Sequence, residues 1–296
     1  MGDASYVIGI KIDRDRDRYV LGLSQNTYIQ KVLERFGMKD CSPSVAPIVK
    51  GDKFHMNQCP MNDLEKEQMH NISYASAVGS LMYAQVCTRP DIVFVIGILG
   101  RYQSNPGLDH WRAAKKVMRY LQGTKDYMLM FRYTDSLEVV GYSDADFVGC
   151  VDSRKSTSGY IFMLAGGAVS WRSAKQSLIA TSTMEAEFVS CFEATSHGVW
   201  LKSFISGLRL VNTISRPLRI FCDNSTAVFF AKNNKSGSRS KHIDIKYLVI
   251  RERVKDNKVV IEHISTELMI ADPLTKCMLP FKFNDHVSRM GLGSIM

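Results

Sequence analysis

Hydrophobic and polar residues alternate along several short stretches of the chain, a pattern typical of β-strands. The first two stretches, 6–13 and 19–23, flank a turn rich in Asp and Arg and are expected to form a hairpin. Further strands are expected at 127–133, 136–143, 157–164, 168–172, 218–222 and 259–264. The pattern therefore predicts strands near the amino terminus and throughout the second half.

Apolar residues recur at intervals of three and four in other stretches, as they do on one face of an α-helix. Helices are expected at 25–36, 74–102 with a break at Thr88-Arg89-Pro90, 108–123, 182–208, 225–232 and 242–255, and from about Leu268. Beyond residue 134 the elements follow the order β-β-β-α-β-α-α-β-α. That order predicts an α/β domain with a mixed sheet.

Changes in this pattern divide the chain into five segments. Residues 1–38 are expected to form a hairpin and a helix, and 39–63 hold three Pro and two Cys, as in a linker. Residues 64–133 are mainly helical, 134–280 form the α/β domain, and 281–296 are expected to be a carboxyl-terminal tail.

The composition is that of a folded globular protein, with 45% hydrophobic and 23% charged residues among 296. No apolar stretch approaches the roughly 20 residues of a membrane span, and the amino terminus lacks the features of a secretion signal. The seven Cys are scattered without a Cys-x-x-Cys pair, which indicates neither a disulfide framework nor a zinc site. We therefore expect an intracellular protein, in the cytoplasm or nucleus, with no membrane partner.

The chain is basic, because 38 Lys and Arg against 29 Asp and Glu give a net charge of +9. This balance suits a polyanionic partner, although many basic proteins bind no nucleic acid. Basic residues are concentrated between 239 and 258. They form either a solvated helix face with ion pairs or a strip that faces phosphates.

Four acidic residues lie at comparable points of the predicted α/β domain. Asp144 follows its first strand and Asp223 ends its fourth, and ligands bind at the ends of adjacent central strands in α/β sheets. Glu185 lies in the first turn of the long helix, and Asp272 lies in the last helix. Taken alone, each acid is most simply a turn, cap or helix-dipole residue. Their joint placement predicts a shared site.

Helix geometry provides a choice between Glu185 and Glu187. Glu185 extends a mostly apolar stripe that continues at 188, 192, 195 and 199 and is expected to face the sheet. Glu187 continues through positions 191, 194 and 198, about 200° around the helix. We therefore expect Glu185, and not Glu187, to point at the strand ends.

Four converging carboxylates would repel one another, and their pKa values would rise. A divalent hard cation relieves the repulsion, and oxygen ligands suit Mg²⁺ or Mn²⁺ rather than zinc. Two such ions about 4 Å apart could activate a water molecule and stabilise the leaving oxygen of a phosphodiester. The acids therefore predict a hydrolytic site for two Mg²⁺ or Mn²⁺ ions, without a small-molecule cofactor.

The chain also carries a series of ordered motifs. Those of the second half are Tyr142-Ser-Asp-Ala-Asp-Phe-Val-Gly149, Arg154-Lys-Ser-Thr-Ser-Gly-Tyr160, Ser170-Trp171, Lys175-Gln176, Ser182-Thr-Met-Glu-Ala-Glu-Phe188, Cys222-Asp-Asn-Ser-Thr-Ala227, Lys241-His-Ile-Asp-Ile-Lys246 and Ala271-Asp-Pro-Leu-Thr-Lys276. Together they resemble the RNase H domain of plant Ty1/copia retrotransposon Pol polyproteins.

Earlier motifs resemble the end of the reverse transcriptase that precedes this domain, roughly its thumb and connection. They are Tyr28-Ile-Gln-Lys-Val-Leu-Glu-Arg-Phe-Gly-Met38, Val78-Gly-Ser-Leu-Met-Tyr83, Thr88-Arg-Pro-Asp-Ile92, His110-Trp111 and Arg119-Tyr-Leu-Gln-Gly-Thr124. The resemblance covers almost the whole chain. It implies an α/β, RNase H-like mixed five-stranded sheet flanked by helices, preceded by a mainly helical thumb and connection remnant.

The resemblance also implies a chemistry, the hydrolysis of the RNA strand of an RNA–DNA hybrid with two Mg²⁺ or Mn²⁺ ions. Asp144, Glu185, Asp223 and Asp272 match the family's catalytic, metal-binding acids. By this match Asp144 would bridge both ions, Glu185 and Asp223 would hold one, and Asp272 would support the other.

Candidate substrate contacts are Arg239, Lys241 and His242, which lie in or beside a family motif and near the basic strip. A surface position at the start of a helix is an equally simple interpretation of His242. Besides the hybrid, other Pol segments are candidate partners. Polymerase activity is not expected, because the chain contains no Tyr-x-Asp-Asp motif.

Three functions remain open from the sequence. The favoured one is an RNase H, and the second is a catalytically silent, nucleic-acid-binding relic of a Pol polyprotein. The third is an unrelated metal-dependent phosphatase or nuclease on a similar sheet, which the density of family motifs disfavours. The presence of all four acids favours the enzyme over the binding protein.

Overall fold

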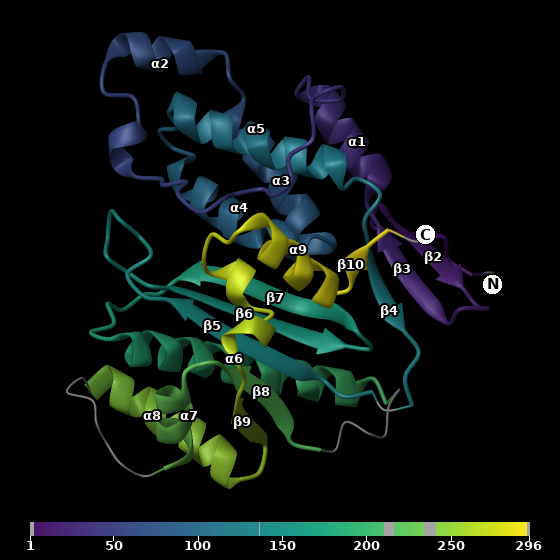
Figure 1. The fold of residues 1–296 in the computed structure, drawn as a ribbon, viewed down its shortest axis with the longest axis vertical. Helices are drawn as coiled ribbons and strands as arrows, with labels where there is room; N and C mark the ends of the chain where they lie inside the picture. Colours follow the sequence, from purple (N-terminus) through teal and green to yellow (C-terminus); the bar gives the residue numbers. More distant parts are fainter. Residues whose placement is uncertain (1–2, 136, 210–215, 234–240, 295–296) are drawn as a thin grey trace. The chain divides into compact units, whose positions relative to one another are not determined.

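The computed structural model describes residues 3–135, 137–209, 216–233 and 241–294, except for the side chains of 241–244. The chain forms two compact units; in Figure 1 the first contains the purple and blue elements together with the yellow end of the chain. Unit 1 contains Met1–Arg132 and Cys277–Met296, and unit 2 contains Tyr133–Lys276. Within the described part of the chain, no helix is both long and apolar enough to cross a membrane.

Unit 1 combines an antiparallel sheet with helices. Its strands, in spatial order, are β1 (Tyr6–Val7), β2 (Ile10–Asp15), β3 (Val20–Ser24), β4 (Met128–Arg132) and β10 (Leu292–Gly293). Its helices are α1 (Asn26–Arg35), α2 (Asp63–His70), α3 (Tyr74–Cys87), α4 (Val93–Leu99), α5 (Leu108–Gly123) and α9 (Pro280–Arg289). The predicted hairpin is the β2–β3 pair. Residues 281–296, which we expected to be a tail, hold most of α9 and all of β10, and β10 pairs with β4.

Unit 2 is built on a mixed five-stranded sheet, which confirms the predicted α/β class. Its strands, in spatial order, are β7 (Gly167–Lys175), β6 (Thr157–Leu164), β5 (Val140–Asp146), β8 (Leu218–Cys222) and β9 (Val259–His263). Strand β5 is antiparallel to β6 and parallel to β8, and β8 is parallel to β9. The central strand β5 therefore has an antiparallel hairpin on one side and a parallel pair on the other.

Helices α6 (Thr183–Gly207), α7 (Ser225–Lys232) and α8 (Lys241–Lys255) pack together beside this sheet (Figure 1). The helix α6 begins after Ser182, whose hydroxyl accepts a hydrogen bond from the amide of Glu185. One apolar core joins the sheet to the helices and includes Phe162 and Ile220 from the strands and Phe188 and Ile250 from the helices. The helices bury one face of the sheet in this way.

Gly198 lies at a point where α6 packs tightly against the sheet. A Cβ atom at this position would lie 2.5 Å from Cδ2 of Leu218 and 2.7 Å from Cε1 of Phe162, both of which belong to the buried core. A side chain at position 198 would therefore push the helix away from the strands. Gly207 ends the same helix and has nothing within 4 Å of its Cβ position.

We expect Gly198→Ala to lower the free energy of unfolding by about 1–3 kcal/mol, because overpacking forces buried side chains to shift. Gly207→Ala serves as the matched control on α6 and should change stability by less than about 1 kcal/mol, in the stabilising direction. Urea denaturation followed by circular dichroism measures both. Equal responses of the two variants would contradict the close approach.

Candidate active site

The parallel pairing of β5 with β8 brings two carboxylates to one edge of the sheet. Ser143 lies opposite Cys222 in this ladder, so the next residues are neighbours: Asp144, which lies within β5 and not after it as expected, and Asp223, which directly follows β8. Asp144 is buried, with 1% of its surface exposed, whereas Asp223 is partly exposed. The predicted adjacency of these two acids follows directly from the strand order.

Asp272 joins this edge from a short 3₁₀ turn, Asp272–Leu274, and not from the α-helix that we expected from about Leu268. Pro273 accounts for the difference, because it lacks the backbone N–H that a helix starting near Leu268 would need at this interior position, whereas it fits the first turn of a helix. Carboxylate oxygens of Asp144, Asp223 and Asp272 all lie within 4.8 Å of one another. The structure thus brings together three of the four acids chosen from the sequence.

Gly159 makes room for the turn that carries Asp272. It lies opposite Asp144 in the antiparallel ladder of β5 and β6. A Cβ atom at position 159 would lie 2.5 Å from Cγ2 of Thr275 and 3.0 Å from Cβ of Leu274. The missing side chain therefore lets the turn lie against β6, where the hydroxyl of Thr275 donates a hydrogen bond to Oδ2 of Asp144.

The fourth acid of the site is Glu187, and the choice of Glu185 over Glu187 is wrong in geometry. The Glu187 carboxylate accepts a hydrogen bond from the backbone amide of Ala145 and feels the charges of Asp144 and Asp223. One of its oxygens lies within 4.8 Å of a ligand atom of Asp223. We call Asp144, Glu187, Asp223 and Asp272 the acidic cluster.

Glu185 instead completes the start of α6. Its Oε2 accepts hydrogen bonds from the amide of Thr181 at 2.8 Å and from the hydroxyl of Thr181 at 2.6 Å. The amide of Glu185 donates in turn to the hydroxyl of Ser182. Such reciprocal bonding is a capping arrangement, which the residue pattern of Ser182 and Glu185 already indicates.

The stripe prediction failed because α6 is buried on every side over residues 185–191. The apolar stripe faces another helix rather than the sheet, since the ring of Phe188 lies 3.8 Å from that of Tyr247 in α8. The small residues Cys191, Ala194 and Gly198, which follow Glu187 around the helix, lie on the side of the strands. Beside them, Ser190 donates a hydrogen bond to the backbone oxygen of Asp144. Small side chains let the helix lie close to the sheet, so the small residues that follow Glu187 were the signal in the sequence that this face, and Glu187 with it, points at the strands.

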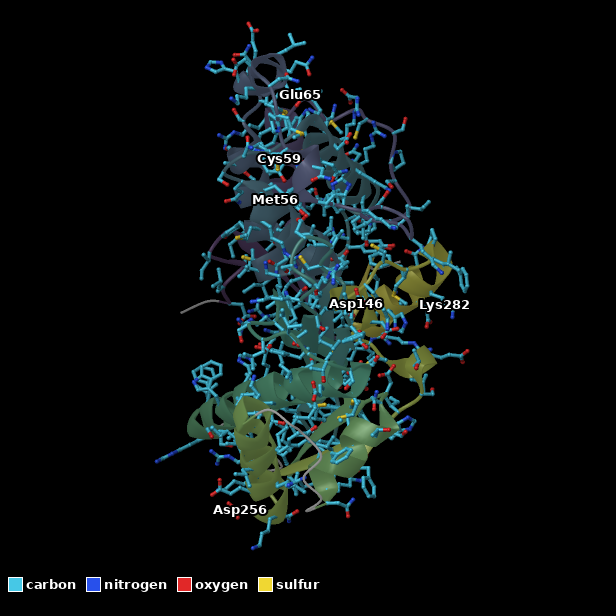
Figure 2. The ribbon with its side chains drawn as sticks, turned by 90° about the vertical axis from the view of Figure 1, so that its left-hand side faces the viewer. Met56, Cys59, Glu65, Asp146, Asp256 and Lys282 are labelled. Atoms are coloured by element: carbon cyan, nitrogen blue, oxygen red, sulfur yellow. The ribbon has the colours of Figure 1, made fainter. Side chains whose placement is uncertain are left out.

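Burial and mutual repulsion raise the pKa values of several acids at this edge. Burial is the first cause for Asp144, Glu187 and Asp272, and the pKa of Asp272 reaches about 7. Asp146, labelled in Figure 2, has its pKa raised to about 6 by burial and by the charge of Asp144. For Lys276, burial lowers the pKa, but the carboxylates of Asp144 and Asp272 outweigh it and raise the pKa. The edge holds more negative charge than one lysine neutralises.

The donor set suits a hard divalent cation. The convergent ligands of Asp144, Asp223 and Asp272 are all oxygen atoms, which favour Mg²⁺ or Mn²⁺. A cationic group already lies among them, because Nζ of Lys276 is 3.0 Å from Asp272 and 3.6 Å from Asp144. The thiol of Cys222 lies 3.9 Å from Glu187 and adds a soft ligand at the rim of the cluster. Residues present at this edge therefore fit the metal chemistry predicted from the sequence.

The candidate substrate contacts remain predictions. Arg239 lies outside the described residues, and so do the side chains of Lys241 and His242, whose backbone begins α8.

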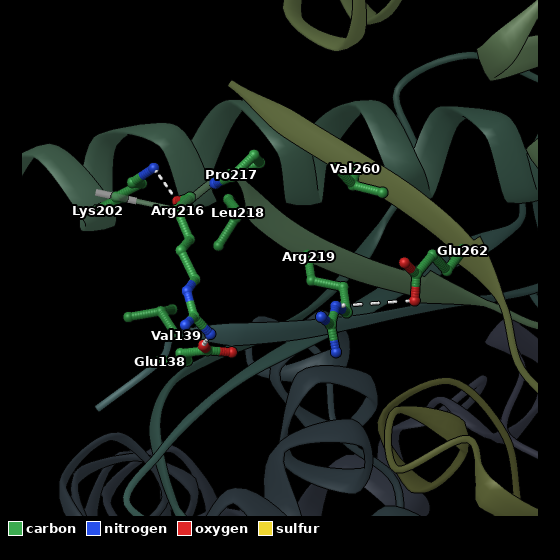
Figure 3. Close-up of a pocket in the computed structure, with 9 residues that line it drawn as sticks. All are labelled: Glu138, Val139, Lys202, Arg216, Pro217, Leu218, Arg219, Val260 and Glu262. Atoms are coloured by element: carbon green, nitrogen blue, oxygen red, sulfur yellow. Dashed lines mark hydrogen bonds and ion pairs between the residues drawn. The ribbon is translucent and has the colours of Figure 1, made fainter. Parts of the chain in front are cut away.

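A separate hollow of about 160 Å³ lies at the opposite ends of β5 and β8 (Figure 3). Its basic side chains have partners within the chain, because Arg216 pairs with Glu138 and Arg219 pairs with Glu262. Lys202 donates a hydrogen bond to the backbone oxygen of Arg216. This hollow is therefore distinct from the acidic cluster, and both of its arginines are paired with glutamates.

Comparison with curated proteins finds Pol polyproteins similar to nearly the whole chain. The "Retrovirus-related Pol polyprotein from transposon TNT 1-94" of Nicotiana tabacum is 43% identical over 294 residues, 99% of this chain and 22% of that protein. The corresponding polyprotein from transposon RE2 of Arabidopsis thaliana is 33% identical over 98% of this chain and 19% of that protein. This chain thus spans about a fifth of the length of these polyproteins.

A shorter relative matches part of the chain. The "Secreted RxLR effector protein 161" of Plasmopara viticola is 51% identical over 133 residues, which are 45% of this chain and 94% of that protein. No family model matches the sequence.

Among solved structures, LC11-RNase H1 in complex with an RNA/DNA hybrid is 18% identical, with a TM-score of 0.35. The match covers 47% of this chain and 94% of that one. The similarity is remote, and the fold is defined by the strand order of the sheet itself.

In the metal-free protein we expect stability to fall as the pH rises from about 4 to about 7. The fold raises the pKa of Asp272 from 3.8 to about 7, so the folded state binds its proton more tightly than the unfolded state does. Between pH 5 and 8 this group should remove about 2–3 kcal/mol of the free energy of unfolding. Denaturation in EDTA at the two pH values measures the loss.

Asp272→Asn should reduce that loss, because its amide does not titrate. Asp256→Asn is the control, since Lys258 lowers the pKa of this exposed carboxyl and the group stays ionised across this range. A pH response of Asp272→Asn identical to that of the wild type would contradict the repulsion at the acidic cluster.

Proposed function

Because the chain belongs to the Pol polyproteins of Ty1/copia-type retrotransposons, we propose that unit 2 is a ribonuclease H. It would hydrolyse the RNA strand of RNA–DNA hybrids at the acidic cluster. The convergence of Asp144, Asp223 and Asp272 carboxylates within 4.8 Å is the observation that carries this proposal. A sheet edge where parallel strands end is also where α/β proteins bind their ligands.

Asp144, Glu187, Asp223 and Asp272 would hold two Mg²⁺ or Mn²⁺ ions. When bound, such ions supply a nucleophilic water at neutral pH and stabilise the charge that develops on the leaving oxygen. Asp144 is the central acid, because it interacts electrostatically with each of the other three. The charge of Asp223 raises the pKa of Asp144, and the charge of Asp144 raises the pKa values of Glu187 and Asp272.

Hydroxyl groups fix the orientation of two of these carboxylates. Thr275 donates to Oδ2 of Asp144, and Thr266 donates to Oδ2 of Asp223 at 2.9 Å. Each of these two acids therefore has one oxygen fixed by a hydroxyl group. Pre-set ligand positions spare the site reorganisation during the reaction.

The substrate class follows from charge and chemistry. The net charge of +9 favours a polyanion, and Arg239, Lys241 and His242 are proposed contacts to the hybrid backbone. Other Pol segments are proposed partners, and we place the activity inside the cell, in the cytoplasm or nucleus. The proposal covers RNA hydrolysis alone, since these 296 residues hold no Tyr-x-Asp-Asp motif.

Cleavage of a labelled RNA–DNA hybrid by the purified chain, with Mg²⁺ or with Mn²⁺, tests the proposal. We expect the RNA strand to be cut, and we expect Asp144→Asn and Asp223→Asn to abolish the cutting because each removes a charged ligand. Folded protein that binds the hybrid but leaves it intact would overturn the proposal. That result would support the catalytically silent binding protein instead.

The paired variants Glu187→Gln and Glu185→Gln test which helix acid serves the site. Glu187→Gln should slow hybrid cleavage roughly a hundredfold or more, because the cluster loses a charged ligand. Glu185→Gln should stay within about threefold of the wild type, because glutamine also serves in the capping arrangement. Initial rates at saturating hybrid give the comparison. Slower cleavage by Glu185→Gln than by Glu187→Gln would contradict this assignment and favour Glu185, the acid chosen from the helical stripe.

A further inference from the structure

Lys276 is the cationic side chain that neutralises the centre of the acidic cluster. Its Nζ lies 3.0 Å from Oδ1 of Asp272 and 3.6 Å from Oδ1 of Asp144. Both aspartates are buried, with 3% and 1% of their surfaces exposed. A buried carboxylate without a counter-charge is strongly unfavourable, so this ammonium stabilises the two acids.

The protein's own groups occupy both oxygens of Asp144. Thr275 donates its hydroxyl hydrogen to Oδ2, and Lys276 pairs with Oδ1. The ammonium therefore lies against the same carboxylate oxygens that a hard cation would use as ligands. A divalent ion that binds through Oδ1 of Asp144 and Oδ1 of Asp272 would take the place where the ammonium now lies, so the ammonium has to leave.

Lys276 has the means to leave this position. Its side chain is 34% exposed, whereas its two partners are buried, so part of the lysine already reaches solvent. Lysine has a flexible four-carbon stem that can carry the charge several ångströms by rotation about its own bonds. Thr275 can keep its hydrogen bond to Asp144 while the lysine moves, since the two groups use different oxygens.

We propose that Lys276 is an internal counter-cation that holds Asp144 and Asp272 in the metal-free protein, and that a divalent ion binds by displacing it. This inference rests on the proposed function, because it assigns a role to a residue of the same site. Lys276 is then a positioning residue. It stabilises the fold when no metal is bound, and it weakens metal binding because it must be displaced.

The proposal predicts opposite effects of one substitution on two measured quantities. Lys276→Gln should destabilise the metal-free protein, because two buried carboxylates lose their counter-charge. The same variant should bind Mn²⁺ more tightly, by roughly three- to tenfold, because no ammonium has to be displaced. A lysine that merely supports the fold would give the first effect without the second.

The experiment titrates Mn²⁺ alone into the full chain by isothermal calorimetry, with thermal unfolding in EDTA alongside. Lys258→Gln is the charge-matched control, because its partner Asp256 lies on the far side of unit 2 from Asp146 (Figure 2). Lys276→Arg is the second variant, which keeps the charge and should fold without metal while binding Mn²⁺ no more tightly than the wild type.

Tighter Mn²⁺ binding by Lys276→Gln than by both Lys258→Gln and the wild type supports the proposal. Equal or weaker binding overturns it, as would equal tightening in Lys276→Arg, in which a cation is retained. Hybrid cleavage measured on the same wild-type sample separates the two ideas. Cleavage without an affinity gain refutes only the role of Lys276, and an affinity gain without cleavage refutes only the ribonuclease.

Discussion

Buried carboxylates repel one another, and unit 2 places several of them around one strand edge. The parallel pairing of β5 and β8 makes Asp144 and Asp223 neighbours before any other contact is considered. Everything else at this edge serves to hold that negative charge in place. The ammonium of Lys276 pairs with Asp144 and Asp272, and the hydroxyls of Thr275 and Thr266 donate to Asp144 and Asp223.

The same edge couples the packing of the fold to its chemistry. Two positions without side chains, Gly159 and Gly198, allow the turn of Asp272 and the helix α6 to lie against the sheet. Close contact delivers Glu187 and Asp272 to the strand ends, where burial raises their pKa values. The site therefore requires tight packing. Repulsion among the carboxylates of the metal-free cluster destabilises the fold, and packing of the surrounding core offsets that destabilisation.

Much of the fold follows from local sequence patterns, because strands and helices have their own periodicities. Helices α5 and α7 begin and end where the pattern predicts. Asp144 and Asp223 are adjacent, as their places after the predicted strands indicated. Features that depend on three-dimensional packing could not be predicted in this way. Residues 185–191 of α6 are buried on all sides and offer no single apolar face, so the stripe argument selected Glu185. The 3₁₀ turn at Asp272 and the pairing of β10 with β4 depend equally on distant contacts.

Unit 1 is built from two separate segments of the chain, because β10 pairs with β4 although all of unit 2 lies between them in the sequence. A ribosome releases residues in order, so the sheet of unit 1 stays open at β4 while all of Tyr133–Lys276 is being synthesised. Unit 2 is continuous and can fold during that interval. The edge of β4 that pairs with β10 can therefore be closed only after residues 277–296 have been synthesised, and it stays available to other strands until then.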